Sequence, residues 1–365
     1  MRKKVKSQNR EAYVKYGSTS NRNVRNSNFE LLRIVAIVFI TMHHLLINGL
    51  DICGYNKPFE ISSSSAVAVM LNSMFVGGVN LFLLISGWFG IKKVIGGIVR
   101  LMFDCAIYGL LVCLIAFCFL GKNLNLSDFF HAIKFTNGWF VPNYMYLLLL
   151  SPLIECSLKK VDVKKIRVWM LLFTFAQCYL GYILKFVDHN GYSAVNFIYL
   201  YCMGRYLRLE YCDFLKKSKT YFFAIYLLTC MFLGGIFLFA ANVGIHIDSL
   251  RFWSYNNPLV LLASLALFVC FSKMNIQNAK INFFATSVLG VYLFLSNFLI
   301  TESRNIGAKI AFSYCGFLAL LIYGVILVLL VGSLILIVNW CRKPILDRIN
   351  LFVSKIDINN EQIRK

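Results

Sequence analysis

Residues 28–50 read NFELLRIVAIVFITMHHLLINGL, an apolar run that carries Arg33, His43 and His44 within it. About 20 helical residues, each rising ~1.5 Å, cross the hydrocarbon core of a bilayer, so this run predicts a membrane-spanning helix. Placing a charged arginine inside such a helix costs at least ~2.5 kcal/mol, and these arginines tend to face a polar cavity or a partner. The run therefore predicts both a first span and a site for polar chemistry.

The polar side chains of this run are aligned. At about 100° per residue, the eleven steps from Arg33 to His44 return to within ~20° of the same helix face, ~16 Å further along the axis. His43 falls ~80° away from that face by the same geometry. Glu30 precedes Arg33 by three residues, the separation at which a carboxylate can pair with a guanidinium. We therefore expect a Glu30–Arg33 pair near one membrane surface and the His44 imidazole at depth on the same face.

A simpler interpretation gives Arg33, His43 and His44 a structural role and no part in a reaction. Arg33 would then extend its side chain to the cytoplasmic interface, and the histidines would make hydrogen bonds between helices. The alignment of Arg33 with His44 favours a functional interpretation, and the rest of the chain has to decide between the two.

The composition defines the class of protein. Of 365 residues, 59% are hydrophobic and 15% are charged, with a mean hydropathy of +0.69. These values are typical of a polytopic membrane protein. The net charge of +21 does not indicate nucleic-acid binding, because the basic residues lie between apolar segments, which is a feature of membrane orientation.

Ten apolar segments follow one another along the chain. They lie at 28–50, 66–91, 98–120, 138–157, 167–187, 194–209, 220–243, 255–272, 283–301 and 311–341. With a cytoplasmic N-terminus, every loop predicted to be inside carries a basic cluster, such as Lys92-Lys93 or Lys159-Lys160. The intervening external loops are nearly balanced in charge, and Arg304 and Lys309 fall in the last of them.

We therefore predict an all-α, polytopic integral membrane protein of about ten transmembrane helices with both termini cytoplasmic. A basic cytoplasmic N-terminal segment would occupy 1–28, the ten-helix transmembrane domain 29–341, and a short cytoplasmic tail 342–365.

Metal and serine chemistry find no support in the sequence. The twelve cysteines form no CxxC pair and no Cys/His metal spacing, so we expect no metal site. No GxSxG elbow, P-loop or HExxH motif occurs. Asp104 lies inside the third span, where we expect it to pair with a basic residue such as Arg100, four residues earlier.

Further polar and aromatic residues lie at the ends of two spans. Asn80 and Ser86 stand in the very apolar second span, and Trp139 and Tyr144 open the fourth. Each has a structural interpretation, as an interhelical hydrogen bond or an interface anchor. The functional interpretation is that Asn80 and Ser86 face the same cavity as His44, and that aromatic rings at a membrane mouth stack on a sugar.

Three of these stretches together resemble the membrane acyltransferase family 3, which contains bacterial O-acetyltransferases of exopolysaccharide, O-antigen, Nod factor and peptidoglycan. Glu30, Arg33 and His44 match its Arg-x10-His motif, which an acidic residue usually precedes. The second-span pattern of the family appears as Gly78-Val79-Asn80-Leu81-Phe82 through Ser86-Gly87, with asparagine where the family has aspartate. Its Trp-Phe-x-x-x-Tyr…Ser-Pro stretch appears as Trp139-Phe140, Tyr144 and Ser151-Pro152.

The later part of the chain extends the resemblance. Tyr255-Asn256-Asn257-Pro258 and Gly290-Val291-Tyr292-Leu293 are both similar to the family, although this sequence continues Phe294-Leu295-Ser296 where the family often has a histidine. The resemblance covers about residues 28–341. No single motif is specific to the family, but the order and spacing of these motifs across ten spans are specific to it.

The resemblance implies an O-acetyltransferase that moves an acetyl or other acyl group from cytoplasmic acetyl-CoA to a hydroxyl of a carbohydrate. Arg33 and His44 would be catalytic: Arg33 would bind a CoA phosphate or order the thioester, through its fixed charge and forked donors. His44 would either take a proton from the attacking hydroxyl or carry the acyl group as an acyl-imidazole. The candidate substrate-binding residues are Glu30, His43, Asn80, Ser86, Trp139 and Tyr144.

The expected partners are the lipid bilayer and a carbohydrate acceptor such as exopolysaccharide, O-antigen or a lipid-linked glycan, with no nucleic acid. The expected location is the bacterial cytoplasmic membrane. The alternative is a transporter or flippase of lipid-linked sugar, for which polar residues within spans are equally suitable. Release of free CoA would distinguish an acyltransferase from a carrier.

Overall fold

The computed structural model describes residues 26–54, 59–134, 138–186, 190–214 and 217–363, so most of the basic segment expected at 1–28 lies outside the described residues. Within these ranges all regular secondary structure is helical, as predicted. In chain order the helices are α2 (Ser27–His44), η1 (Leu45–Leu50), α3 (Ser63–Phe75), α4 (Gly78–Phe89), α5 (Val94–Cys118), α6 (Leu126–Ile133), α7 (Phe140–Lys160), α8 (Val163–Ala176), η2 (Gln177–Ile183), α9 (Ala194–Phe214), α10 (Lys219–Asn242), α11 (Ser249–Phe252), α12 (Pro258–Ser272), α13 (Ala279–Phe284), η3 (Ala285–Ser287), α14 (Val288–Leu295) and α15 (Phe298–Ile363).

Several helices are long and apolar enough to cross a membrane. Among the described residues there are six: Ser27–Leu50, Ser63–Phe89, Val94–Cys118, Val163–Ile183, Lys219–Asn242 and Phe298–Ile349. Two shorter apolar helices, Pro258–Ser272 and Ala279–Leu295, accompany them. The chain is therefore a multi-pass, all-helical membrane protein, whereas the total of ten spans and the side on which the termini lie stay predictions.

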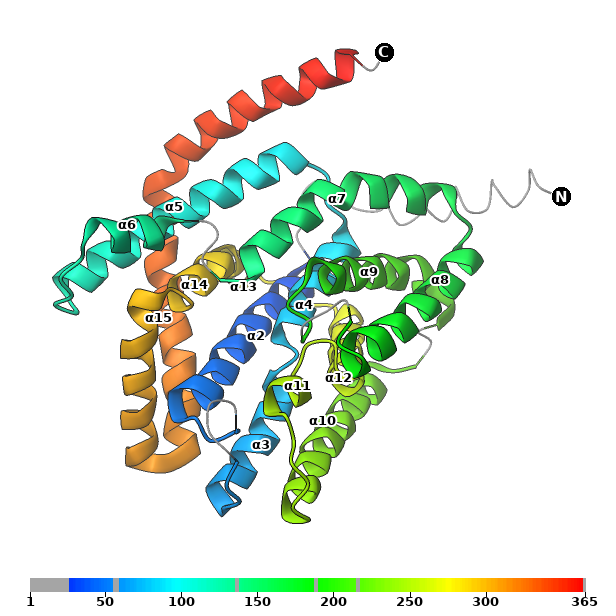
Figure 1. The fold of residues 1–365 in the computed structure, drawn as a ribbon. Helices are drawn as coiled ribbons and strands as arrows, with labels where there is room; N and C mark the ends of the chain where they lie inside the picture. Colours follow the sequence, from blue (N-terminus) through cyan, green and yellow to red (C-terminus); the bar gives the residue numbers. More distant parts are fainter. Residues whose placement is uncertain (1–25, 55–58, 135–137, 187–189, 215–216, 364–365) are drawn as a thin grey trace.

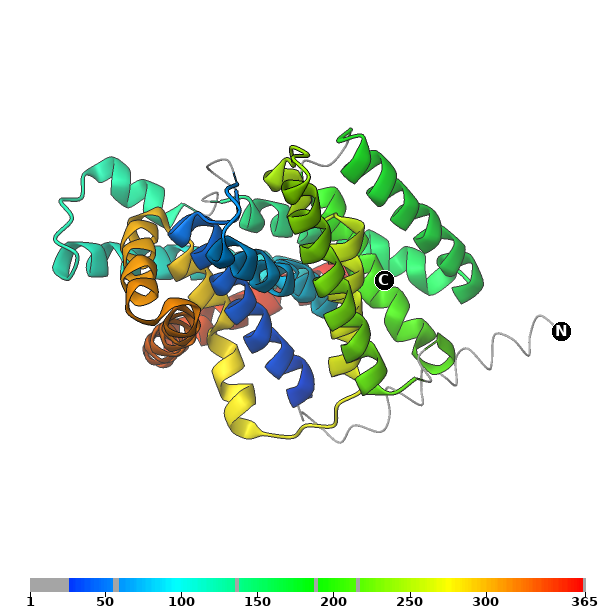
Figure 2. The same cartoon turned by 90° about the horizontal axis from the view of Figure 1, so that it is seen from below.

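The first span lies in the middle of the bundle. Helix α2 contacts α3, α4, α12, α13, α14 and α15 (Figure 1, Figure 2). A Cβ on Gly78 of α4 would lie 2.9 Å from the carbonyl oxygen of Ala36 and from a side-chain carbon of Ile40, so only glycine permits this crossing of α4 over α2. Small residues that allow backbones to approach closely are the usual means of packing helices within a bilayer.

A second close crossing joins α4 to α9. A Cβ on Gly87 would come far closer than 3.0 Å to the carbonyl oxygen of Tyr201, and a Cβ on Gly204 would do the same to that of Leu84. Packing therefore explains why the second-span pattern has a glycine, Gly87, after Ser86: the α9 backbone passes directly over this position.

The end of the chain folds differently from its predicted spans. The structure has no loop at 302–310, because α15 begins at Phe298 and continues through this region. The break comes at Cys315 and Gly316, where Gly316 has φ 58° and ψ −140°, a conformation that is essentially restricted to glycine. It divides α15 into two arms that lie side by side in Figure 1, and a Cβ on Gly307 of the first arm would collide with the Tyr323 ring of the second. The predicted bounds 283–301 and 311–341 are thus corrected, and Arg304 belongs to a helix and not to an external loop.

Candidate functional site

The acidic and basic residues at the start of α2 form the expected pair. Arg33 Nη1 lies 2.8 Å from Glu30 Oε1 and 2.9 Å from Glu30 Oε2. The Arg33 side chain is 32% exposed, and its guanidinium carbon lies 6.0 Å from the centre of the Phe89 ring. Glu30 therefore compensates the charge of Arg33 while leaving part of the guanidinium accessible to a ligand.

His44 lies on the same face of α2, further into the bundle. The helix is α-helical from Ser27 to His44, so the rotation of 100° per residue applies to the whole interval from Arg33 to His44. Ile37 and Ile40 occupy the same face between them and are 1% and 5% exposed. The face that joins the two residues is therefore inside the protein and is not directed at lipid.

The neighbouring histidine has a partner that the sequence did not indicate. His43 Nδ1 lies 2.6 Å from Asn72 Oδ1 of α3, and both side chains are buried. A carboxamide oxygen can only accept a hydrogen bond, so Nδ1 of a neutral His43 carries the proton and donates it. The ring of His43 is 5.9 Å from that of His44. His43, expected to bind substrate, is thus engaged with Asn72.

A second arginine, Arg304, lies on the first arm of α15, which packs along η1, the continuation of α2. The Arg304 side chain is buried, with 4% exposed. Nη1 donates to the carbonyl oxygen of Leu295 at 2.9 Å, and Nε and Nη2 donate to Asn305 Oδ1 at 3.3 and 3.1 Å. Sequence reasoning missed this residue, because it placed Arg304 in a solvated loop.

The remaining predicted site residues fall into two groups. Asn80 is fully buried, and its Nδ2 donates to the carbonyl oxygen of Tyr255 at 2.9 Å. The Trp139 ring stacks on that of Tyr255, with ring centres 5.3 Å apart. Asn80 and Trp139 therefore meet at Tyr255, just before α12.

The other group joins α4 to α7. Ser86 Oγ lies 3.4 Å from the Tyr144 hydroxyl and donates to the carbonyl oxygen of Phe82 at 2.9 Å. Tyr144 also stacks on the ring of Phe140. The expectation that Asn80 and Ser86 share a cavity with His44 stays a prediction.

A family model described as an acyltransferase domain, acyltransferase family 3, matches residues 26–340. The chain belongs to this family. No curated protein and no solved structure matches it.

The match to acyltransferase family 3 covers all the residues described above. It begins one residue before α2 and ends two residues before Arg342, the first basic residue of the expected tail. It therefore includes the aligned Arg33 and His44, the partner Asn72 and also Arg304, although nothing in it assigns a role to any of these side chains.

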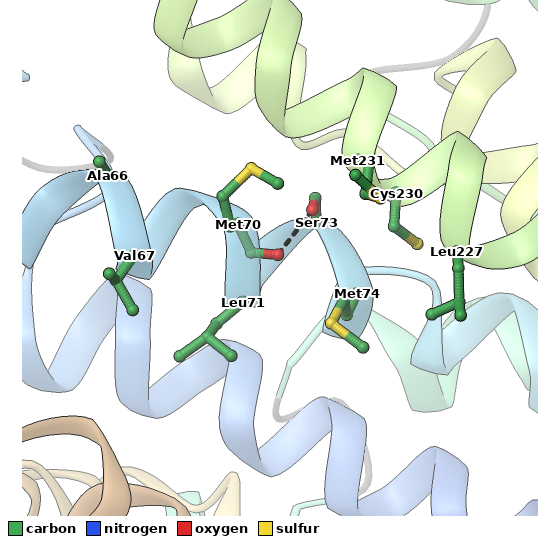
Figure 3. A pocket seen from close by; sticks show the side chains of 9 residues that line it. All are labelled: Ala66, Val67, Met70, Leu71, Ser73, Met74, Leu227, Cys230 and Met231. Atoms are coloured by element: carbon green, nitrogen blue, oxygen red, sulfur yellow. Dashed lines mark hydrogen bonds between the residues drawn. The ribbon is translucent and has the colours of Figure 1, made fainter.

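A cavity of about 320 Å³ lies between α3 and α10 (Figure 3). Its lining is almost wholly apolar and consists of Ala66, Val67, Met70, Leu71, Ser73, Met74, Leu227, Cys230 and Met231. The Ser73 hydroxyl is turned back to the carbonyl oxygen of Met70, 2.7 Å away, so the cavity presents little that could orient a polar substrate.

Two further findings concern charged side chains of this family member. Asp104 pairs with Arg342 of α15 and not, as expected, with Arg100, because α15 returns along α5 and brings a guanidinium to it. Tyr108 accepts a hydrogen bond from Arg342 Nη2 at 2.7 Å.

Among the residues that the structure describes, no three His, Cys, Asp or Glu side chains gather as metal ligands would.

Proposed function

We propose that the protein is a membrane O-acyltransferase that moves an acyl group, most simply acetyl, from cytoplasmic acyl-CoA to a hydroxyl of a cell-surface or lipid-linked carbohydrate. The observation that carries the proposal is the alignment of Arg33 and His44 on one buried face of α2, in a chain that belongs to an acyltransferase family. The acceptor class is inferred from the family resemblance.

Arg33 is suited to hold the donor. Its guanidinium is partly accessible, and Glu30 fixes its position by accepting two hydrogen bonds. A planar guanidinium can bind a phosphate with paired hydrogen bonds, and CoA carries its phosphates at one end of a long, thin pantetheine arm. The ~16 Å between Arg33 and His44 along the helix would be spanned by that arm.

His44 is suited to the transfer step. The acceptor hydroxyl oxygen forms a bond to the thioester carbonyl carbon while His44 takes its proton. The bond from that carbon to sulfur then breaks, and the proton passes to the departing CoA thiolate. In the alternative route His44 itself attacks, forms an acyl-imidazole and releases CoA before the hydroxyl arrives. Both routes yield a carbohydrate ester and free CoA.

The membrane arrangement we propose is ten spans with both termini cytoplasmic, in a bacterial cytoplasmic membrane. The basic clusters between alternate apolar segments support this orientation. The two arms of α15 support the separate ninth and tenth spans of this proposal, because the turn at Gly316 takes the place of the loop expected at 302–310. Arg33 then lies towards the cytoplasm, where acyl-CoA is found.

The decisive experiment uses inside-out membrane vesicles that contain the protein, label in the acetyl group of acetyl-CoA, and a crude host glycan extract. We expect label to enter an alkali-labile ester and free CoA to appear in equal amounts. His44→Ala should abolish both, whereas His43→Ala, which removes a side chain engaged with Asn72, should retain measurable transfer.

Two results would contradict the proposal. Full activity in a well-expressed His44→Ala protein would remove His44 from the reaction. Absence of both ester and free CoA, with an extract shown to be competent by another O-acetyltransferase, would instead favour a carrier or flippase, because transport of a glycan releases no CoA.

A further inference from the structure

Arg33 of α2 and Arg304 of α15 differ in how their charges are compensated. Arg33 has a carboxylate partner in Glu30 and is partly exposed. Arg304 is 4% exposed, and in the part of the chain that the structure describes its hydrogen bonds go only to neutral oxygens, those of Leu295 and Asn305. A buried charge without a counter-ion is costly, and in proteins it usually marks a functional position.

The first arm of α15 holds Arg304 level with His44. This arm packs along η1, which continues α2, and both run in the same direction in Figure 1. A Cβ on Gly49 would lie 3.1 Å from Cβ of Ala308 and 3.9 Å from Asn305 Oδ1. Gly49 follows His44 by about one helical turn and Ala308 follows Arg304 by one turn, so the contact between Gly49 and Ala308 places Arg304 at the level of His44 along the bundle.

The guanidinium of Arg304 is held in place by three hydrogen bonds, which do not use all of its N–H donors. An arginine has five N–H donors, and the hydrogen bonds to Leu295 and Asn305 use three of them, one on each nitrogen. One N–H on each terminal nitrogen is left over. The remaining donors belong to a fixed cation in a site with little water, where an interaction with a negative charge is much stronger than in bulk solvent.

Acyl transfer creates such a charge. When a nucleophile adds to the thioester carbonyl carbon, the π electrons move onto the carbonyl oxygen, which becomes an oxyanion until the bond from carbon to sulfur breaks. This step is common to the general-base and the acyl-imidazole routes. Arg33 is ~16 Å from the imidazole along the helix and is compensated by Glu30, so it is not suited to this charge.

Building on the proposed function, we propose that Arg304 is the oxyanion-stabilising catalytic residue, donating from its free N–H groups to the thioester carbonyl oxygen during attack at His44. The side chain of Asn305 would then have a positioning role, because it accepts from Nε and Nη2 and so orients the guanidinium.

The test compares Arg304→Gln, Arg304→Lys and Glu302→Gln in the full-length protein in vesicles. Glu302→Gln is the matched control: it removes one charge from the same helix two residues earlier, at an exposed side chain that pairs with Lys122. Rates of free CoA release give kcat and the KM for acetyl-CoA, and thermal unfolding in detergent shows whether each variant is folded.

We expect Arg304→Gln to lower kcat on the order of 10²-fold or more, which is the usual effect of losing one oxyanion donor, with the KM for acetyl-CoA within a few-fold of wild type. Arg304→Lys, which keeps the charge but not the fork, should recover part of the rate, and Glu302→Gln should leave kcat unchanged.

Three results would overturn the inference. The first is a wild-type kcat in a folded Arg304→Gln protein. The second is an equal loss of rate in the Gln and Lys variants together with a lower unfolding temperature, because this would indicate a structural role. The third is the absence of CoA release from the wild-type protein. This result would refute the proposed function itself, and it differs from the first two because it needs no mutation.

Discussion

His43 of α2 donates a hydrogen bond from Nδ1 to the carboxamide oxygen of Asn72 on α3, across 2.6 Å. The bond ties the polar end of the first span to the second, and it sets the orientation of the ring that lies next to His44. Because Nδ1 is the donor, Nε2 of the neutral His43 ring is the nitrogen that can accept. The pair is therefore a structural support for the candidate site, and it explains why two histidines stand together in one span.

The first prediction concerns the energy of this pair. Asn72→Leu should lower the free energy of unfolding by about 1–3 kcal/mol, since it leaves a buried N–H of His43 without an acceptor. The double variant His43→Phe/Asn72→Leu should lose less than the sum of the two single changes, because replacing both partners by apolar groups removes the unsatisfied donor. Chemical unfolding in detergent measures all four proteins, and strict additivity would show that the two side chains do not interact.

The second prediction concerns the donor end of the aligned face. Arg33→Gln should raise the KM for acetyl-CoA about 10- to 100-fold, since a charge-assisted hydrogen bond contributes ~1.5–3 kcal/mol. The KM for acetyl-pantetheine, which lacks the phosphates of CoA, should hardly change. Steady-state release of the free thiol from each donor gives both values. An equal loss with the two donors would instead mean that Arg33 orders the thioester.

The third prediction concerns the buried ion pair between Asp104 and Arg342, whose side chains are 5% and 6% exposed. Asp104→Asn should cost about 3–5 kcal/mol of stability, because it leaves the Arg342 charge buried without its partner. Asp104→Asn/Arg342→Met should recover much of that loss. Thermal unfolding in detergent is the measurement, and Lys122→Gln, which breaks a more exposed pair, should cost less than about 1 kcal/mol.

The fourth prediction concerns the crossing of α4 and α9. Gly87→Ala or Gly204→Ala should destabilise the protein by about 1–3 kcal/mol, because each new methyl group meets a backbone carbonyl that cannot move out of the way. Gly235→Ala in α10 is the matched control, since no atom lies within 4 Å of the added Cβ. It should leave stability unchanged or raise it slightly, as alanine favours a helix. Equal unfolding temperatures for the three variants would contradict the close crossing.

The sequence was informative where the governing interactions are local. The spacing from Glu30 to Arg33 predicted an ion pair that the structure contains, since both residues lie on one turn of one helix. The same periodicity placed Arg33 and His44 on one face, and α2 is unbroken between them. The family resemblance, built from short motifs in order, led to the family to which the chain belongs.

The errors came from polar residues whose partners are distant in the chain. Glu302, Arg304 and Lys309 made 302–310 resemble a loop, yet in the structure Lys122 and the Leu295 carbonyl satisfy the first two within a helix. The turn falls instead at Gly316, inside the apolar segment 311–341 that was predicted to be the last span. Asn72 was overlooked for the same reason, because nothing in the surrounding sequence shows that His43 faces it.

The amino-acid sequence by itself determined the class of the protein, its helical character and the alignment of Arg33 with His44, because hydropathy and helical periodicity are properties of neighbouring residues. The tertiary structure alone decided which polar groups meet inside the bundle: His43 with Asn72, Asp104 with Arg342, and Arg304 with the Leu295 carbonyl. The physical reason is that buried polar groups must be satisfied by whatever the packing of helices brings to them, and that packing depends on close backbone contacts such as those at Gly78 and Gly87.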